Sequence, residues 1–467
     1  MKIEQIYTKC LAQGAYYIES EGEVAVIDPL RETFPYIDRA KKDGAEIKYI
    51  FETHFHADFV SGHLDLSKGT GAQIVFGPEA KPTFTFHSAT DGEVFNIGAL
   101  TITVIHTPGH TMESTCYLLK DSDDKQLALF TGDTLFIGDV GRPDLAQKSA
   151  DMSKEDLAGM LFESLRTKVL PLDDDLIVYP GHGAGSACGK NMSKETFSTL
   201  GEQKKNNYAF DSKLSKIDFV NQLIDGLLPP PGYFGLNVAL NKSGYDNIDE
   251  VINRGLTPLK LQSFNTHLED KDVLVLDTRT ASDFAKGHIP GSLFIGLEGQ
   301  FAPWVGAVIP NIKQKLVLIT PMGKEEETVR RLSRVGFDQV IGYLNGGFQE
   351  WLENNERIES VNRIHVNDLL ELDISSTRIV DVRKPGEYEA SHINDAVLLP
   401  LDFINDNINA YPDTPFLLHC AGGYRSMIAA SILKRNGVND IKDVIGGFNA
   451  IPENSEITST FICPNGG

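Results

Sequence analysis

The first 210 residues alternate short apolar runs with polar turns. Six apolar runs each stop on His, Asp or Gly, at residues 24–29, 47–54, 72–77, 99–110, 127–133 and 176–183. Short apolar runs that end in turn residues are typical of buried strands in layered α/β proteins. Polar residues gathered at strand ends are where active sites form on such scaffolds. We therefore expect a functional site at the ends of these strands.

The pattern changes after the last of these strands. Residues 213–233 indicate a helix that is broken at 229–232 by three prolines and a glycine, because successive prolines cannot continue a helix. We predict a first domain over residues 1–235 and a linker over residues 236–255.

The remainder contains an internal repeat of about 100 residues. In both copies eleven positions separate a strand-ending Asp from a His, and a second apolar strand, a helix and a glycine pair follow. The pairs are Asp277 with His288 and Asp381 with His392. This order of elements predicts a parallel α/β sheet in each copy. We place the copies at 256–357 and 360–467.

Composition and charge limit the functions of the chain. A length of 467 residues suggests about three domains. Lys and Arg total 43 against 65 Asp and Glu, a net charge of −22, which repels phosphate backbones and anionic lipid. No apolar run approaches the roughly 20 residues that span a bilayer, and the N-terminus lacks the pattern of a signal peptide. We expect neither a nucleic-acid partner nor membrane insertion.

The five cysteines are too few, and odd in number, to form a disulfide framework. A reducing, cytoplasmic setting is therefore expected, in which any special thiol is more chemical than structural.

Four strand-end motifs carry groups that bind metals. They are His54-Phe55-His56-Ala57-Asp58, His110 in TPGHT, Asp133 in FTGD and His182 in YPGHG. Imidazoles and carboxylates are ligands of zinc and of ferrous iron. One such histidine alone favours a surface or core role, but four clusters in this order predict a metal centre.

Over residues 1–235 these motifs resemble the metallo-β-lactamase superfamily, whose pattern is His-x-His-x-Asp-His, then a His, an Asp and a His. The resemblance implies an αββα sandwich with metal between the sheet edges. One position departs from it, because Phe59 follows Asp58 where the two-metal hydrolases of the family carry His. Phenylalanine cannot bind a metal, so we predict one metal ion per chain. His63 could substitute only if the loop were rearranged.

With a single metal, the sequence resembles the persulfide dioxygenase branch of the family. This resemblance implies Fe(II) held by His54, His110 and Asp133. Two histidines and one carboxylate leave three positions open for substrate sulfur and dioxygen. His56, Asp58 and His182 then orient ligands or waters. Arg142 is a candidate for charge stabilisation. A structural salt bridge is an equal alternative for Arg142.

Cys420 ends an apolar strand and begins the loop CAGGYRS before a helix. Loop glycines, a helix N-terminus and Arg425 together form an anion cradle, and that field favours a nucleophilic thiolate. The expected binding loop consists of Ala421, Gly422, Gly423, Tyr424 and Ser426. A buried structural cysteine fits this loop poorly.

The second copy resembles a rhodanese domain, whose loop is Cys-x-x-Gly-x-Arg. The resemblance implies that Cys420 carries a persulfide sulfur and that Arg425 steers an anionic acceptor. Related phosphatases use a longer loop than the five positions found here. The first copy is also rhodanese-like, but Thr320 replaces the cysteine and Glu325 the arginine. We therefore expect that copy to be an inactive spacer or interaction module.

Cys188 follows His182 by six residues in a Gly/Ala-rich loop. It could line the substrate channel and accept a sulfur in transit, or simply fill space as a small apolar side chain.

The sequence thus predicts a multidomain α/β protein, an αββα sandwich followed by two rhodanese-like parallel-sheet domains. The function that fits best is oxidation of a low-molecular-weight persulfide by O2 to sulfite, with one Fe(II) per chain. Cys420 would then combine sulfite with persulfide sulfur to give thiosulfate, or run in reverse. A homo-oligomer is expected.

Two other functions stay open. One is a zinc thioester hydrolase similar to glyoxalase II, with the rhodanese domains as sulfur carriers. The other is non-enzymatic, with the repeats acting as a scaffold.

Overall fold

The computed structural model describes residues 1–145, 147, 151–453 and 455–460. These residues form two compact units, one of 1–248 with 333–336 and the other of 249–332 with 337–467. The two rhodanese-like copies therefore share one unit. Cys463 and the end of the second predicted copy lie outside the described residues.

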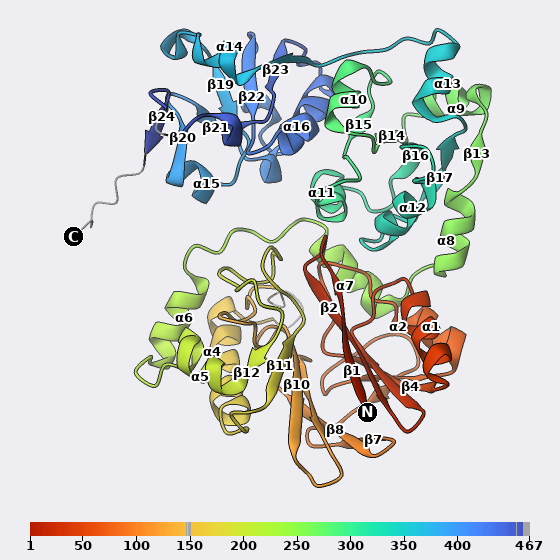
Figure 1. The fold of residues 1–467 in the computed structure, drawn as a ribbon, viewed down its shortest axis with the longest axis vertical. Coiled ribbons are helices and arrows are strands. Elements are labelled where there is room, and N and C mark those ends of the chain that lie inside the picture. The colour runs from red at the N-terminus through yellow and green to blue at the C-terminus, as the bar shows by residue number, and fades with distance from the viewer. Residues whose placement is uncertain (146, 148–150, 454, 461–467) are drawn as a thin grey trace. The chain divides into compact units, whose positions relative to one another are not determined.

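Two six-stranded sheets form the centre of the first unit (Figure 1). The first has the order β1-β2-β3-β4-β5-β6 and is antiparallel up to β3 and parallel beyond it. Its strands are β1 (Lys2–Thr8), β2 (Gln13–Ser20), β3 (Glu23–Ile27), β4 (Glu46–Glu52), β5 (Gln73–Phe76) and β6 (His87–Ser88). The second has the order β12-β11-β10-β9-β8-β7. Its strands are β7 (Val94–Ile97), β8 (Leu100–His106), β9 (Thr115–Lys120), β10 (Gln126–Gly132), β11 (Ile177–Pro180) and β12 (Ser198–Thr199).

Alternation along the strands builds three apolar layers. Tyr16, Tyr117 and Phe130 point into a core between the sheets, whereas their neighbours Tyr17 and Leu118 point to the opposite faces. Helices cover both outer faces, with α1 and α2 on one side and α4, α5 and α6 on the other (Figure 1). They are α1 (Phe34–Asp43), α2 (His63–Thr70), α4 (Lys154–Ser164), α5 (Leu200–Asn206) and α6 (Lys216–Ile224). The predicted αββα sandwich is confirmed.

The predicted linker at 236–255 differs from the structure, which places two helices there, α7 (Phe234–Ser243) and α8 (Ile248–Gly255). Helix α7 packs onto the first unit, where Asn241 Nδ2 donates to the carbonyl oxygens of His56 and Phe59. The sequence shows no clear apolar period here because α7 buries two asparagines, Asn237 and Asn241.

The second unit contains two five-stranded parallel sheets of the same topology, as the repeat predicts. Their orders are β13-β17-β16-β14-β15 and β18-β23-β22-β19-β21. The strands are β13 (Pro258–Leu259), β14 (Val273–Asp277), β15 (Leu293–Phe294), β16 (Lys315–Ile319), β17 (Val340–Leu344), β18 (Asn362–Ile364), β19 (Ile379–Asp381), β21 (Val397–Leu398), β22 (Phe416–His419) and β23 (Ile441–Val444). A two-stranded antiparallel sheet of β20 (Ser391–Ile393) and β24 (Thr458–Thr460) adjoins the second copy.

Helices of the first copy are α9 (Leu261–Leu268), α10 (Ala281–Lys286), α11 (Phe301–Val308), α12 (Glu325–Ser333) and α13 (Gly347–Glu353). Those of the second are α14 (Val366–Leu370), α15 (Pro385–Ala390) and α16 (Tyr424–Arg435). Shorter helical turns lie at Leu165–Val169, Tyr208–Phe210, Ile374–Ser376, Leu401–Phe403, Ile408–Ala410 and Phe448–Ala450. Across the described residues, no helix is both long and apolar enough to cross a membrane.

The Asp-to-His spacing of the repeat has a structural cause. In the first copy Asp277 pairs with Arg279 at 2.6 Å, and His288 stacks on Phe284 with ring centroids 3.9 Å apart. The second copy repeats both contacts with Asp381 and Arg383 at 2.6 Å, and with His392 on Tyr388 at 3.8 Å. These residues hold a loop and a helix against the sheet, so the spacing reports the fold rather than catalysis.

Candidate metal centre and candidate thiol site

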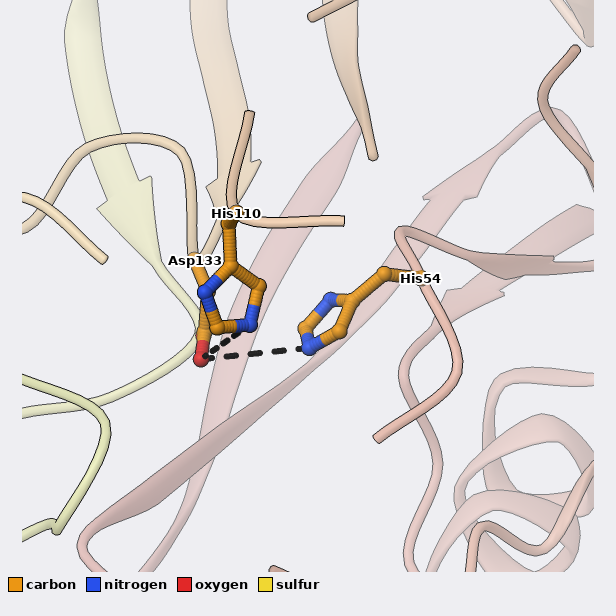
Figure 2. Close-up of side chains that lie close together, drawn as sticks. All are labelled: His54, His110 and Asp133. Atoms are coloured by element: carbon orange, nitrogen blue, oxygen red, sulfur yellow. Dashed lines mark ion pairs between the residues drawn. The ribbon is translucent and has the colours of Figure 1, made fainter. Parts of the chain in front are cut away.

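Three predicted ligands meet at the strand ends of the first unit. His54 follows β4, His110 lies between β8 and β9, and Asp133 follows β10. Asp133 Oδ2 lies 3.8 Å from His54 Nε2 and 3.5 Å from His110 Nε2 (Figure 2). All three side chains are buried, and their ligand atoms lie within 4.8 Å of one another. We call these residues the ligand group.

Hydrogen bonds fix the orientation of both histidines. His110 Nδ1 lies 2.8 Å from the carbonyl oxygen of Arg142, which can only accept, so this nitrogen carries the proton. His54 Nδ1 lies 2.9 Å from the Thr53 hydroxyl, which already donates to Asp28 and therefore accepts here. Burial and the neighbouring histidines hold the pKa of His54 well below its usual value. The Nε2 atom of each histidine thus has a free lone pair, as a metal ligand requires.

Asp133 supplies the test of whether a metal fits. Both of its carboxylate oxygens are buried and have no hydrogen-bond partner among the described residues. A buried carboxylate without a partner is costly unless it coordinates a metal or gains a proton. Two oriented imidazoles and this carboxylate therefore fit a divalent ion of the zinc or ferrous type.

A second set of donors lies beside the first. The ligand atoms of His56, Asp58 and His182, which we call the outer group, also lie within 4.8 Å of one another. His182 Nε2 is 3.5 Å from Asp58 Oδ2 and 3.6 Å from Asp133 Oδ1. Burial alone would lower the pKa of His182, but the carboxylates of Asp58 and Asp133 raise it well above its usual value.

The Nε2 atom of His56 faces the carboxylates of Asp28 and Glu52. This atom lies 3.1 Å from Asp28 Oδ1 and 3.4 Å from Glu52 Oε2. Although burial opposes the charge, these two carboxylates raise the pKa of His56 to about 10. Phe59 stacks on the same ring, with centroids 4.3 Å apart and an angle of 28°. The Nε2 of His56 therefore faces carboxylates outside the ligand group, which favours a supporting role for this residue.

Sequence reasoning missed Asp28 and Glu52, although each stands at the end of a predicted strand. The signal was present, since a carboxylate follows the apolar run of β3 and another ends β4. Asp28 lies 28 positions before His56 and follows a different strand, whereas Glu52 lies four positions before it at the end of β4. No local pattern encodes the contact with Asp28.

Cys188 lies at the metal centre. Its sulfur is within 4.8 Å of ligand atoms of Asp133 and His182, and the residue is 1% exposed. Burial, together with the charges of Asp133 and Asp58, raises the pKa of Cys188 to about 12. The side chain is therefore a neutral thiol beside the ligand group, and its role as a sulfur acceptor stays a prediction.

Arg142 forms the salt bridge that the sequence left open. Its guanidinium makes two bonds to Asp144, at 2.6 and 2.7 Å, and donates to the carbonyl oxygens of Ala187 and Leu228. The residue acts on the metal centre through its own carbonyl oxygen, which accepts from His110. Charge stabilisation by Arg142 stays a prediction.

Sequence reasoning missed three buried polar side chains at the start of helix α7 and within it. Tyr233, Asn237 and Asn241 are spaced four apart, share one helix face and are buried. Burial, and then the charges of Asp58 and Cys188, raise the pKa of Tyr233 well above its usual value. The amide nitrogen and oxygen of Asn237 are buried without a hydrogen-bond partner among the described residues.

The second site lies at the end of β22. Cys420 is 1% exposed, and the Gly423 N–H donates to its sulfur over 3.1 Å. Gly423 has a φ of +92°, so the chain turns in the left-handed region just before α16 begins. A loop amide and the positive end of a helix therefore face the sulfur, as the predicted cradle requires.

Arg425 has a partner that the sequence did not indicate. Its Nη1 and Nη2 donate to the two oxygens of Glu387 over 2.6 and 2.7 Å. The bond to Arg425 lowers the pKa of the Glu387 carboxyl. The guanidinium thus ties the loop to α15, and its steering of an anionic acceptor stays a prediction.

Hydrogen bonds to other segments hold the remaining loop positions. The Cys420 carbonyl accepts from Phe448 N–H over 2.7 Å, and the Ala421 carbonyl from Asn449 over 2.9 Å. A Cβ on Gly447 would lie 2.3 Å from the Cys420 oxygen, which explains the second glycine of the repeated pair. Ser426 Oγ donates to Asp443 over 2.6 Å.

The matching loop of the first copy is filled by its own carboxylate. Glu325 Oε1 accepts from the Thr320 hydroxyl and from the Gly323 N–H, both at 3.2 Å. Gly323 is the counterpart of Gly423, so the amide that bonds sulfur in one copy bonds a carboxylate in the other. This loop has neither a thiol nor a free anion cradle.

Two family models match the chain. The metallo-beta-lactamase superfamily matches residues 9–182, and the rhodanese-like domain matches residues 260–354 and 366–454. A crystal structure of a metallo-beta-lactamase from Staphylococcus aureus is 30% identical, with a TM-score of 0.65. That match covers 74% of this chain and 99% of the other. The chain therefore belongs to the metallo-beta-lactamase superfamily and carries two rhodanese-like domains.

Curated relatives match part of the chain. Hydroxyacylglutathione hydrolase GloC of Haemophilus influenzae is 28% identical over 236 residues, which are 46% of this chain and all of that protein. The probable hydroxyacylglutathione hydrolase glo2 of Schizosaccharomyces pombe is 32% identical over 178 residues, or 38% of this chain. The second match spans 64% of that relative, less than two thirds of its length.

Proposed function

We propose that this chain is an iron-dependent persulfide dioxygenase coupled to a sulfurtransferase. The observation that carries the proposal is the surroundings of His56, whose Nε2 faces Asp28 and Glu52 and whose ring is stacked by Phe59. Phe59 also takes the place of a histidine that could have served as a nitrogen ligand beside Asp58. Both features support a single ion in the ligand group.

The ligand group has the donor set of a two-histidine, one-carboxylate site. His54, His110 and Asp133 would hold ferrous iron, which supplies a redox centre for dioxygen and substrate sulfur. The proposed overall reaction converts a persulfide RSSH, O2 and water into the thiol RSH, sulfite and two protons. The terminal sulfur loses four electrons, and dioxygen accepts them.

The residues around the ligand group handle orientation and protons. Thr53 and the Arg142 carbonyl fix the two imidazoles, and the buried surroundings exclude bulk water. His182 holds a proton between Asp58 and Asp133, where its Nε2 can protonate the thiolate that leaves the substrate.

Sulfur transfer would take place at Cys420. Its thiolate attacks the terminal sulfur of a second persulfide, forms a new S–S bond and releases the carrier thiol. The sulfur lone pair of sulfite then attacks that terminal sulfur, so that thiosulfate leaves and the Cys420 thiolate returns. The Gly423 N–H, already on the sulfur, stabilises negative charge at each stage.

A product assay tests the coupling. With a persulfide, O2 and iron-loaded protein, the wild type should form thiosulfate, whereas Cys420→Ser should consume oxygen at the same rate and accumulate sulfite. Equal thiosulfate from both proteins would remove the transferase half of the proposal. Absence of oxygen uptake in both would remove the dioxygenase half.

A second candidate is a zinc thioester hydrolase, which the names of the curated relatives favour. It predicts turnover of hydroxyacylglutathione without oxygen uptake, by a water activated at the metal. Thioester turnover by the zinc-loaded protein, with an inert iron-loaded form, would select this candidate.

A further inference from the structure

Tyr424 of the Cys420 loop is bonded to the other repeat. Its hydroxyl donates to the carbonyl oxygen of Gly296 over 2.7 Å. Its ring also lies edge-on to Phe294, with centroids 6.1 Å apart. Tyr424 follows Gly423, whose N–H bonds the Cys420 sulfur.

The first repeat is shaped around this ring. A Cβ on Gly296 would lie 3.0 Å from the Arg279 carbonyl oxygen and from Phe294 Cζ, and 3.2 Å from Cε2 of Tyr424. One on Gly299 would lie 3.3 Å from Tyr424 Cζ. Any side chain at either position would press on the ring. Both glycines belong to the segment after β15, in the repeat that has no catalytic cysteine.

Further contacts from the same repeat hold the helix behind the loop. The Phe294 N–H donates to Ser431 Oγ on α16 over 3.0 Å, and Arg435 at the end of α16 donates to the Gly291 carbonyl. Within the loop itself, by contrast, Gly422 borders open space. Besides the bonds to the carbonyl oxygens of Cys420 and Ala421, the position of the Gly423 amide therefore depends on the residues that follow it.

We propose that Tyr424 is a positioning residue for sulfur transfer, and that the cysteine-free repeat serves as its support by fixing the loop through Gly296. This inference rests on the proposed transferase function. It gives the first repeat a role beyond that of a spacer, because its segment 294–299 sets where the loop amide meets the sulfur of Cys420.

The test compares Tyr424→Phe with the matched control Tyr411→Phe. Tyr411 also donates from a buried hydroxyl to a carbonyl oxygen, that of Leu399 at 3.2 Å, but it lies outside the loop. Sulfur transfer from thiosulfate to cyanide is measured as kcat and KM, and alkylation of Cys420 by iodoacetamide is followed on its peptide at one fixed pH. In Tyr424→Phe we expect kcat to fall by about tenfold, the effect of one hydrogen bond, with KM unchanged. The alkylation rate should also change by about tenfold. Tyr411→Phe should stay within about twofold of wild type, because it loses the same kind of bond elsewhere.

A second variant tests directly whether the first repeat supports the loop. Gly296→Ala leaves Tyr424 intact but crowds its ring, so it should lower kcat in the same direction. If wild type transfers sulfur and both variants match Tyr411→Phe, the inference is overturned while the proposed function stands. If wild type transfers none, the proposed transferase fails, and altered alkylation in Tyr424→Phe alone would still support the positioning role.

Discussion

The ligand group and the outer group contain the same kinds of side chain, but their hydrogen bonds differ. In the ligand group, oxygens hold the Nδ1 atoms of His54 and His110, and both Nε2 atoms face Asp133. In the outer group, Nε2 of His56 faces the carboxylates of Asp28 and Glu52 instead. The comparison teaches that the hydrogen bonds and charges around a buried histidine, and not its presence alone, decide how well it suits a metal.

The largest expected effect is loss of a ligand-group residue. His110→Ala removes a nitrogen and should lower iron affinity by more than about 100-fold, since even loss of an outer hydrogen-bond partner costs 10–100-fold. Iron content of the purified variant and its oxygen uptake should both fall to background. A variant that keeps one iron per chain would show that His110 is not a ligand.

Loss of His56 should act on stability instead. His56→Ala removes the cation between the buried Asp28 and Glu52, which keep only hydrogen bonds such as those from Thr53 and Ser61. Breaking a buried ion pair in this way costs about 3–5 kcal/mol in the free energy of unfolding. Urea unfolding measures this cost, and iron content measured below the transition should remain at one per chain. Loss of iron from the folded variant would place His56 among the ligands and end the comparison.

Phe59→His sharpens the comparison by changing the metal count. The new imidazole would stand next to Asp58 and near His182, where it supplies the nitrogen that the outer group lacks. We expect zinc content to rise from one to two per chain, at a stability cost of about 1 kcal/mol for the lost stack. Phe59→Leu is the matched control and should keep one metal ion.

Cys188→Ser should have the smallest effect on metal content. The Cys188 sulfur lies near ligand atoms of Asp133 and His182, but it does not share a cluster with His54 or His110, the nitrogen donors of the ligand group. Iron content should stay within about twofold of wild type, the scale on which removal of a group that does not ligate acts. Complete loss of iron would make the cysteine sulfur a ligand.

The two rhodanese-like loops show a parallel difference. In one, Gly423 N–H bonds the sulfur of Cys420; in the other, Gly323 N–H bonds the carboxylate of Glu325. The same backbone amide therefore bonds the Cys420 sulfur in one loop and the Glu325 carboxylate in the other. The difference lies in the side chains of the two loops.

Much of this could be predicted from the sequence because the chemistry sits at strand ends. His54, His110 and Asp133 each follow an apolar strand, and the packing of the two sheets brings these strand ends together. The repeated spacing of Asp277 and Asp381 to their histidines likewise predicted two copies of one fold.

The rest depended on contacts between distant segments. Glu387 bonds Arg425 across 38 positions, and Asn241 bonds His56 across 185. Helix α7 looked like a linker because polar side chains fill its buried face. Local patterns report which residues are apolar, but they do not report which polar residues meet in the fold.

The most direct test of the central claim measures metal content and oxygen uptake on the same preparation. Protein loaded anaerobically with ferrous iron should hold one ion per chain and consume one O2 for each persulfide oxidised. Two zinc ions per chain, together with an iron-loaded form that leaves oxygen untouched in the presence of persulfide, would contradict the account.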